Sequence, residues 1–140
     1  MSVMALDLGE KRIGVAISDS TLTVAHPLSV LPAQEVLDNA PSFTRLLKDY
    51  EVESFLVGLP VSLDGTEQTQ ANRIRSQVKR LKELYKLPVE YQDERLTSVE
   101  AKRVLRQLGY SEKDMRGKTD KIAACILLQT WLDGRLSLEG

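Results

Sequence analysis

The chain has 140 residues, of which 28% are charged and 42% hydrophobic, with a formal net charge of −1. This length commonly supports one hydrophobic core without disulfides, so we expect residues 1–140 to form a single domain. The near-neutral total does not by itself indicate a nucleic-acid binder. However, residues 71–125 hold 14 Lys and Arg against 8 Asp and Glu, a local excess of +6, which favours the second half for phosphate contacts.

Cys125 is the only cysteine, which excludes an intramolecular disulfide,. Its apolar neighbours predict a buried residue without a catalytic or redox role. The first residues lack a basic region followed by an apolar run, and no stretch approaches the roughly 20 apolar residues that span a bilayer. We therefore expect a soluble cytoplasmic protein with no membrane partner.

Three strands are predicted at the start of the chain. Residues 3–8 form a short apolar run, and residues 12–18 alternate between branched apolar and small side chains after a tight turn,. A third strand is predicted over residues 28–31, and Pro27 and Pro32 at its ends favour an edge position. Together these segments predict an antiparallel meander.

Helices and strands alternate in the next part of the chain. Residues 36–47 have roughly helical apolar spacing, and Pro41 either splits this segment or begins its main helix. Residues 53–59 predict a buried strand, and residues 67–85 predict a long charged helix with one narrow apolar stripe and otherwise solvated faces. Residues 88–92 alternate as a strand.

Two helices are predicted in the last part of the chain. A capping box at residues 97–100 begins the first, and Gly109 is a natural end for it. Residues 120–136 supply the second, with an apolar face,. The complete order predicts an α/β fold, a mixed five-stranded sheet flanked by helices.

Three carboxylates stand at the ends of these elements. Asp7 interrupts the apolar first strand, where a charge is costly unless it is solvated, paired or metal-bound, although it could simply cap the turn. Glu94 follows a strand, where ligands of open α/β sheets bind, or lies in a solvated turn. Asp120 opens a helix, where its ordinary role is to stabilise the helix dipole. Carboxylates from separate elements also suit Mg²⁺ or Mn²⁺ in phosphodiester hydrolysis.

Basic residues lie beside these carboxylates in the sequence. Arginine can hold phosphate oxygens bidentately and lysine adds positive potential, although a solvated surface is the ordinary fate of such side chains. Our predicted nucleic-acid contacts are Lys11, Arg12, Arg95, Lys118 and Lys121. The long helix could extend this phosphate track or simply be solvated, and its cations are Arg73, Arg75, Lys79, Arg80 and Lys82.

Four stretches, taken in order, resemble the YqgF/RuvX family of Holliday junction resolvases and ribosomal-RNA-maturation nucleases. They are Asp-Leu-Gly-Glu-Lys-Arg-Ile-Gly-Val-Ala-Ile-Ser-Asp (7–19), Val-Gly-Leu-Pro (57–60), Asp-Glu-Arg-Leu-Thr-Ser (93–98) and Lys-Thr-Asp-Lys-Ile-Ala-Ala (118–124). The resemblance covers essentially the whole chain and implies an RNase H-like fold.

The same resemblance implies which residues act together. It brings Asp7, Glu94 and Asp120 together as catalytic residues and as ligands of Mg²⁺ or Mn²⁺. It also implies a substrate role for residues 58–60 and 64–66, for which a Pro-Gly-rich strand-to-helix loop is an adequate structural explanation.

The leading hypothesis is a metal-dependent endonuclease that hydrolyses phosphodiester bonds. The resemblance implies 5′-end maturation of precursor small-subunit ribosomal RNA, with structured RNA as substrate and ribosomal particles as a candidate partner. One alternative is a Holliday junction resolvase on branched DNA, which ought to be a two-fold dimer, so monomer and homodimer both stay open. Another is a non-catalytic RNA-binding or transcription-associated module.

Overall fold

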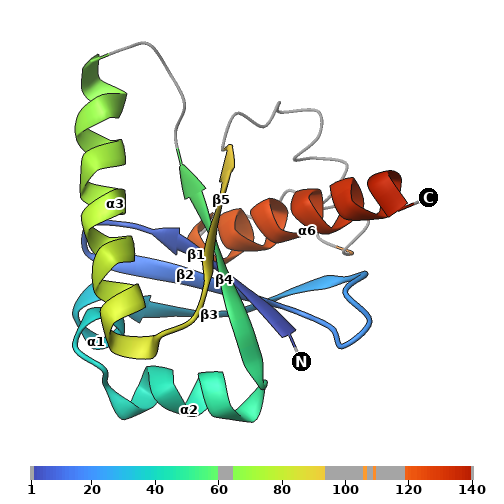
Figure 1. Cartoon of the computed structure of the whole chain (residues 1–140), viewed down its shortest axis with the longest axis horizontal. Helices are drawn as coiled ribbons and strands as arrows, with labels where there is room; N and C mark the ends of the chain where they lie inside the picture. Colours follow the sequence, from blue (N-terminus) through green and yellow to red (C-terminus); the bar gives the residue numbers. More distant parts are fainter. Residues whose placement is uncertain (1, 60–64, 94–105, 107–108, 110–118, 140) are drawn as a thin grey trace.

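The centre of the protein is a five-stranded sheet with the strand order β3-β2-β1-β4-β5 (Figure 1). The computed structural model describes residues 2–59, 65–93, 106, 109 and 119–139. The strands are β1 (Ser2–Leu8), β2 (Arg12–Ser18), β3 (Ala25–Pro32), β4 (Val52–Leu59) and β5 (Val89–Asp93). The first three pair antiparallel, whereas β4 and β5 run parallel to β1. The predicted mixed five-stranded sheet is confirmed, and the carboxyl ends of β1, β4 and β5 share one edge.

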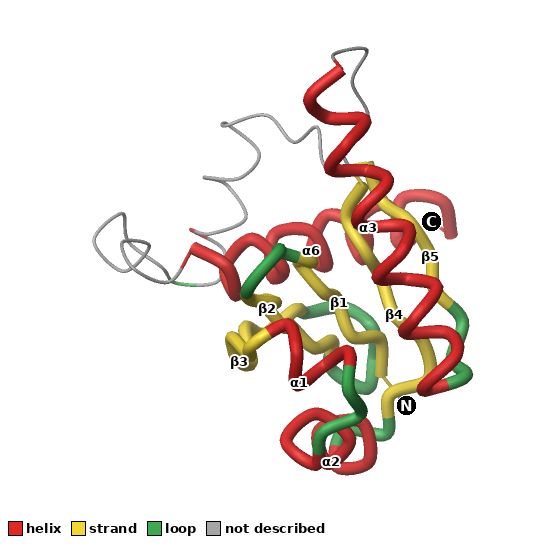
Figure 2. Tube along the Cα trace, turned by 90° about the vertical axis from the view of Figure 1, so that its left-hand side faces the viewer, coloured by secondary structure: helices red, strands yellow, loops and turns green. Residues whose placement is uncertain are grey.

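Helices cover both faces of the sheet (Figure 2). The helices α1 (Ala33–Leu37), α2 (Pro41–Asp49) and α3 (Gly65–Tyr85) contribute to the core on one face. The helix α6 (Thr119–Glu139) packs on the other face. The predicted α/β layering therefore agrees with the structure.

Proline accounts for two differences from the predicted elements. Pro41 occupies the first turn of α2 behind an extended Ala40, so the predicted segment 36–47 is two short helices,. β3 begins at Ala25, earlier than predicted, and a register shift in its pairing with β2 accommodates Pro27 inside the strand. Pro27 is tolerated there because β3 is an edge strand, as predicted,.

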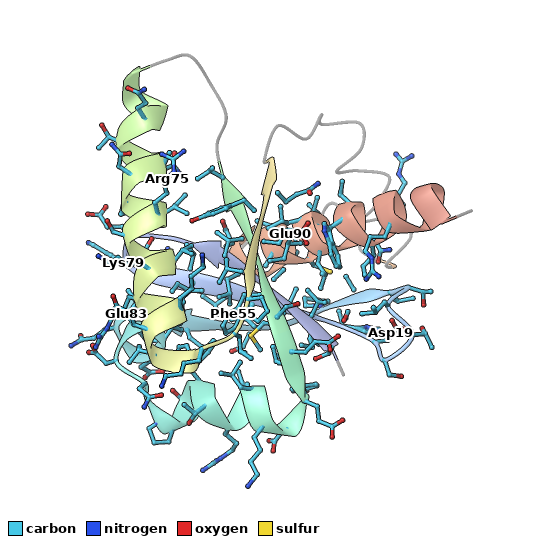
Figure 3. The ribbon with its side chains drawn as sticks, viewed as in Figure 1. Asp19, Phe55, Arg75, Lys79, Glu83 and Glu90 are labelled. Carbon is cyan, nitrogen blue, oxygen red and sulfur yellow. The ribbon has the colours of Figure 1, made fainter. Side chains whose placement is uncertain are left out.

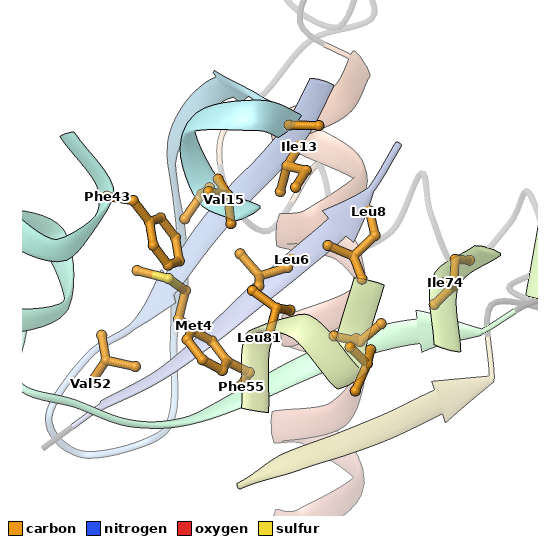
Figure 4. Close-up of a cluster of buried hydrophobic side chains, with 14 of the residues drawn as sticks. Met4, Leu6, Leu8, Ile13, Val15, Phe43, Val52, Phe55, Ile74 and Leu81 are labelled. Carbon is orange, nitrogen blue, oxygen red and sulfur yellow. The ribbon is translucent and has the colours of Figure 1, made fainter. Parts of the chain in front are cut away.

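The larger core lies between the sheet and the three helices α1, α2 and α3 (Figure 4). Met4, Leu6 and Leu8 of β1 enter this core at every second position because strand side chains alternate between faces,. Rings of Phe43 and Tyr85 pack with centroids 5.1 Å apart within the same core. The intervening residues of β1 face the second core instead.

The second core lies under α6 and contains one polar anchor. The buried Gln129 accepts a hydrogen bond from the backbone N–H of Ala25 at 2.8 Å and donates to the carbonyl of Thr23 at 3.0 Å. Cys125 is buried beside it, and burial raises the pKa of its thiol to about 12. The predicted burial of Cys125 is confirmed, and a thiol of this kind is unreactive.

Part of the predicted helix before Gly109 lies outside the described residues. Gly109 itself has a φ of +83°, and its N–H donates to the carbonyl of Arg106 at 3.1 Å. That geometry matches the end of a helix. Within the described ranges, no helix combines the length and the apolar character needed to cross a bilayer.

The loop between β2 and β3 is organised by one carboxylate, Asp19. Its two oxygens accept hydrogen bonds from the hydroxyls of Thr21 and Thr23 and from the backbone N–H groups of Thr23 and Val24, at 2.6–3.1 Å. Desolvation acts to raise the pKa of Asp19, but these hydrogen bonds outweigh it and hold the pKa well below its ordinary value of 3.8. The hydrogen bonds that order this loop therefore favour the ionised form of the Asp19 side chain.

We predict that Asp19 contributes to acid sensitivity. Because folding lowers its pKa, its contribution to stability is present above pH 3.8 and is lost as the pH falls further below that value,. Asp19→Asn should lower the urea midpoint at neutral pH and flatten its fall in strong acid. Asp49→Asn, an exposed change on α2, is the control and should follow the wild type. Equal acid profiles for wild type and Asp19→Asn would contradict the assignment.

Candidate active site

Asp7 lies near the carboxyl end of the central strand and is half-buried. Val3 and Ala5 of β1 belong to the core under α6, so the same alternation places Asp7 on the α6 face of the sheet,. It is one residue from the strand's end, at the edge where β4 and β5 also finish. A charged group can persist there because the strand end lies close to solvent.

Glycines occupy the positions beside Asp7 on both neighbouring strands. Gly14 of β2 is its direct partner. On the other side Leu6 pairs with Val57, so the next position along β4, beside Asp7, is Gly58. Cross-strand neighbours point to the same face, and glycine has no side chain there. The α6 face around the carboxylate is therefore free of side chains from these two positions.

Gly58 and Leu59 belong to β4, so the predicted strand over residues 53–59 is confirmed at this end. The interpretation of residues 58–60 and 64–66 as a strand-to-helix loop is wrong for Gly58, a buried member of β4 that pairs with Gln92 of β5, and for Gly65 and Thr66, which begin α3. Leu59 still belongs to the strand and pairs with Asp93, whereas Pro60 and Asp64 lie outside the described residues. The Gly-Leu pair thus extends the sheet to its edge.

A tight turn connects Asp7 to the predicted phosphate contacts. The N–H of Gly9 donates to the carbonyl of Arg12 at 3.0 Å, and a Cβ on Gly9 would stand 2.3 Å from that oxygen. Such a distance is impossible without moving backbone, so the turn requires glycine. Lys11 and Arg12 are exposed on this turn. Lys11 and Arg12 thus follow Asp7 within one tight turn, and their contact with phosphate stays a prediction.

Two side chains of α3 hold this turn from the opposite face. Arg73 donates to the carbonyl of Leu8 at 3.1 Å, and Gln77 donates to the carbonyl of Gly9 at 3.0 Å. Each also has a buried atom without a hydrogen-bond partner, Nε of Arg73 and Oε1 of Gln77. We define Arg73 and Gln77 as the turn clamp. The expectation that the non-apolar faces of this helix are all solvated is wrong, because the clamp is packed against the turn.

The same finding divides the predicted basic track of α3. Arg73 is committed to Leu8, and Arg80 donates to the carbonyl of Leu37 at 3.1 Å. Arg75, Lys79 and Lys82 are exposed. The sequence analysis did not single out Gln77. An uncharged amide between Arg73 and Arg80, on the same side of the predicted helix, was the available signal.

The first turn of α6 lies toward the same edge as Asp7 (Figure 1). Gln129 of α6 anchors Ala25, which the sheet register places beside the start of β1. Asp120 is nine residues earlier, about 14 Å along a helix. The distance from the start of β1 to Asp7 is about 13 Å. The backbone of α6 therefore returns Asp120 toward the end of β1 that carries Asp7.

The other predicted site residues are described only in part. Glu94, Arg95 and Lys118 lie outside the described residues. Asp120 and Lys121 are helical, but only their backbone is described. Among the described side chains, no group of three His, Cys, Asp or Glu could hold a metal ion. His26 is exposed, and Trp131 packs against the α6 core with Arg135 over its ring, 4.9 Å from the centroid.

Comparison with protein families and curated sequences gives consistent matches. The family profile described as RuvX, Holliday junction resolvase, matches residues 1–134. A protein of Anaeromyxobacter sp. (strain Fw109-5) is 41% identical over 96% of this chain and 98% of its own length. A protein of Streptococcus mutans serotype c (strain ATCC 700610 / UA159) is 42% identical over 95% of this chain and 98% of its own length. Both relatives carry the provisional name pre-16S rRNA nuclease.

Solved structures of junction-cutting enzymes have the same fold. The T. thermophilus RuvC in complex with Holliday junction substrate gives a TM-score of 0.66 at 14% identity, covering 98% of this chain and 96% of that chain. The Fowlpox virus resolvase with Holliday junction DNA gives a TM-score of 0.57 at 14% identity, covering 97% of this chain and 99% of that chain. At such low sequence identity these matches show the fold alone. The structural similarity confirms the predicted RNase H-like architecture.

We predict that Gly9→Ala lowers the free energy of unfolding by about 1–3 kcal/mol, because the new Cβ displaces the turn backbone,. Gly134→Ala is the matched control: this helical glycine is exposed, and its Cβ would meet nothing within 4 Å. It should raise stability by roughly 0.5–1 kcal/mol. Urea titration measures both, and a Gly9→Ala protein as stable as the wild type would show that the turn relaxes freely.

Proposed function

The chain belongs to the RuvX family, and we propose that it is a metal-dependent endonuclease acting in 5′-end maturation of precursor 16S ribosomal RNA. The observation that carries this proposal is the placement of Asp7: a half-buried carboxylate beside two glycine positions, one residue from the end of the central strand. Relatives of about 40% identity over nearly the whole chain carry the matching provisional name. A shared nuclease fold supports the reaction class.

The proposed metal ligands are Asp7, Glu94 and Asp120. All three are carboxylates, which Mg²⁺ and Mn²⁺ prefer, so the donor set fits a hard divalent cation. Asp7 lies on the face of the sheet that α6 covers, and the first turn of α6 carries Asp120. When bound, such a cation supplies an activated water and charge stabilisation at a phosphodiester.

The proposed roles of the basic residues follow from their places around this edge. Lys11 and Arg12 are exposed on the turn that follows Asp7, within reach of a phosphate brought to that carboxylate. Arg12 would hold phosphate oxygens bidentately, and Lys11 would add positive potential. Arg95, Lys118 and Lys121 are proposed for the same task because they adjoin Glu94 and Asp120 in the sequence.

A Holliday junction resolvase is the second candidate. The family description and the folds of the two resolvases favour it. Symmetric cutting of a four-way junction would need a two-fold dimer, whereas trimming one RNA end would not. We favour the RNA substrate because the full-length relatives are named for it. Action on ribosomal RNA would place the protein in the cytoplasm and beside ribosomal particles. That residues 1–140 form a single domain stays a prediction.

We predict that Asp7→Asn reduces the rate of cleavage by more than about 100-fold. Substituting a residue that only hydrogen-bonds to a metal ligand already lowers metal affinity or activity by roughly 10–100-fold. The substitution removes a charge with little change in volume, so nucleic-acid binding should persist. Cleavage of labelled precursor ribosomal RNA and of a four-way DNA junction would be measured with Mg²⁺, Mn²⁺ or EDTA.

The matched control for this experiment is Asp49→Asn, the same chemical change at an exposed position of α2. It should cut like the wild type. Metal-dependent cleavage of the RNA alone supports the maturation nuclease, and symmetric cleavage of the junction alone supports the resolvase. Undiminished cleavage by Asp7→Asn would refute the catalytic assignment, and cleavage that persists in EDTA would refute metal dependence.

A further inference from the structure

A row of cations runs along one flank of α3 and onto the residue that follows it. Arg75, Lys79, Lys82 and Lys86 are all exposed. The spacing of four and three residues places Arg75, Lys79 and Lys82 on one side of α3 over about 10 Å. Lys86 follows the end of the helix with a φ of +55°. Arg75 also donates a long hydrogen bond, 3.4 Å, to the side chain of Asn72. We call these four residues the basic row.

The basic row lies on the flank of α3 that faces away from the β1–β2 turn. The turn clamp and Arg80 point toward that turn and toward α1. At 100° per residue, the basic row is on the opposite side of the helix. Because the sheet order places β4 and β5 on the other side of β1 from β2, this flank overlooks the β5 edge.

An exposed aromatic ring lies on the same side of that edge strand. Tyr91 of β5 pairs with Val57 of β4, whose side chain belongs to the core under α3, so Tyr91 shares the α3 face. Its 39% exposure is large for an aromatic side chain in a strand. At the sheet edge, the ring therefore has a solvent-facing surface on the side where the basic row lies.

The hydrogen bond between Arg73 and Leu8 relates the basic row on α3 to the strand position of Tyr91. The hydrogen bond from Arg73 sets α3 level with Leu8. Lys79 is six residues further, about 9 Å down the helix. Leu6, in the cross-strand row that includes Tyr91, is about 7 Å from Leu8 down the strand,. Lys79 and the ring are thus each within about 10 Å of the level of Leu8 along their own elements, on the same side of the sheet.

Two carboxylates with described side chains lie near this surface, and neither faces Tyr91. Glu90 pairs with Leu56 of the α6 core, so it points to the opposite face of the sheet. Glu83 lies at the border of the row and is 4.0 Å from Arg80, on the side away from β5. Figure 3 shows Arg75 and Lys79 along α3. The flank therefore presents cations to solvent on the side where the sheet ends.

We infer that the basic row and Tyr91 form a binding surface for a single-stranded RNA segment adjoining the cleavage site; this rests on the proposed function. Successive cations neutralise the phosphates of one strand, and an exposed ring stacks a base, which is the combination that single-stranded nucleic acid requires. A paired duplex keeps its bases stacked inside and cannot use the ring. Tyr91 is two residues before the carboxyl end of β5, so the strand reaches the edge that carries Asp7.

The test is the affinity of a labelled single-stranded RNA oligonucleotide, measured in EDTA across a range of salt concentrations. Arg75→Gln/Lys79→Gln should weaken binding about 25-fold at 0.1 M salt, because each lost phosphate contact reduces the salt slope by roughly 0.7. The control Arg45→Gln/Lys48→Gln removes the same two charges from exposed positions of α2. It should bind nearly as the wild type does.

The stacking role is tested with substitutions that keep the strand apolar. Tyr91→Leu should weaken binding of the single strand by about tenfold, since stacking is worth roughly 1–3 kcal/mol per base, whereas Tyr91→Phe should not. Neither should change the affinity for a blunt RNA duplex.

The inference is overturned if the α3 pair and the α2 pair weaken binding equally, or if Tyr91→Leu binds the single strand as the wild type does. Because binding in EDTA involves no cleavage, a protein that binds in this way but cuts no substrate would contradict the proposed nuclease and leave the binding surface supported. Conversely, cleavage that depends on Asp7 without any dependence of binding on the row would contradict only this inference.

Discussion

The alternation of side chains along β1 is the constraint on which the rest of the structure depends. β1 is the central strand and has an apolar layer on each face, so its odd and even residues must both be buried until the strand reaches the edge,. Asp7 falls on the α6 face one position from that edge. A shift of one residue would place the carboxylate in the core under α3 and Leu6 at the site. The register of β1 therefore determines both packing and chemistry.

The helix α3 links the two sides of this arrangement. One flank carries the turn clamp, which fixes the backbone immediately after Asp7. These hydrogen bonds are part-buried, so losing them would leave the carbonyl oxygens of Leu8 and Gly9 less well paired and would loosen the turn,. The opposite flank carries the basic row. One rigid element thus relates the position of the carboxylate to the surface where we place the RNA strand.

The sequence was sufficient to predict the elements whose causes are local. Strand alternation in β1 and β2, the apolar stripe of α3 and the edge position implied by Pro27 were all readable and agree with the structure. The family resemblance predicted the RNase H-like fold, which local patterns cannot predict, because the convergence of distant residues depends on strand order. Turn hydrogen bonds were not readable: Arg73 looks like any surface arginine, and only the register of α3 against β1 commits it to Leu8.

The position of Tyr91 illustrates the same distinction and has a consequence for substrate selection. Alternation predicted a strand around it, but only the sheet order and register make β5 an edge and place the ring on the α3 face of the sheet. An RNA strand held by that ring and by the basic row on the α3 face would have to pass the shared edge of the sheet to reach Asp7, which lies on the α6 face. The proposed surface would therefore select a cleavage position by the length of RNA between the held segment and that edge, because neither phosphate contacts nor stacking read base identity.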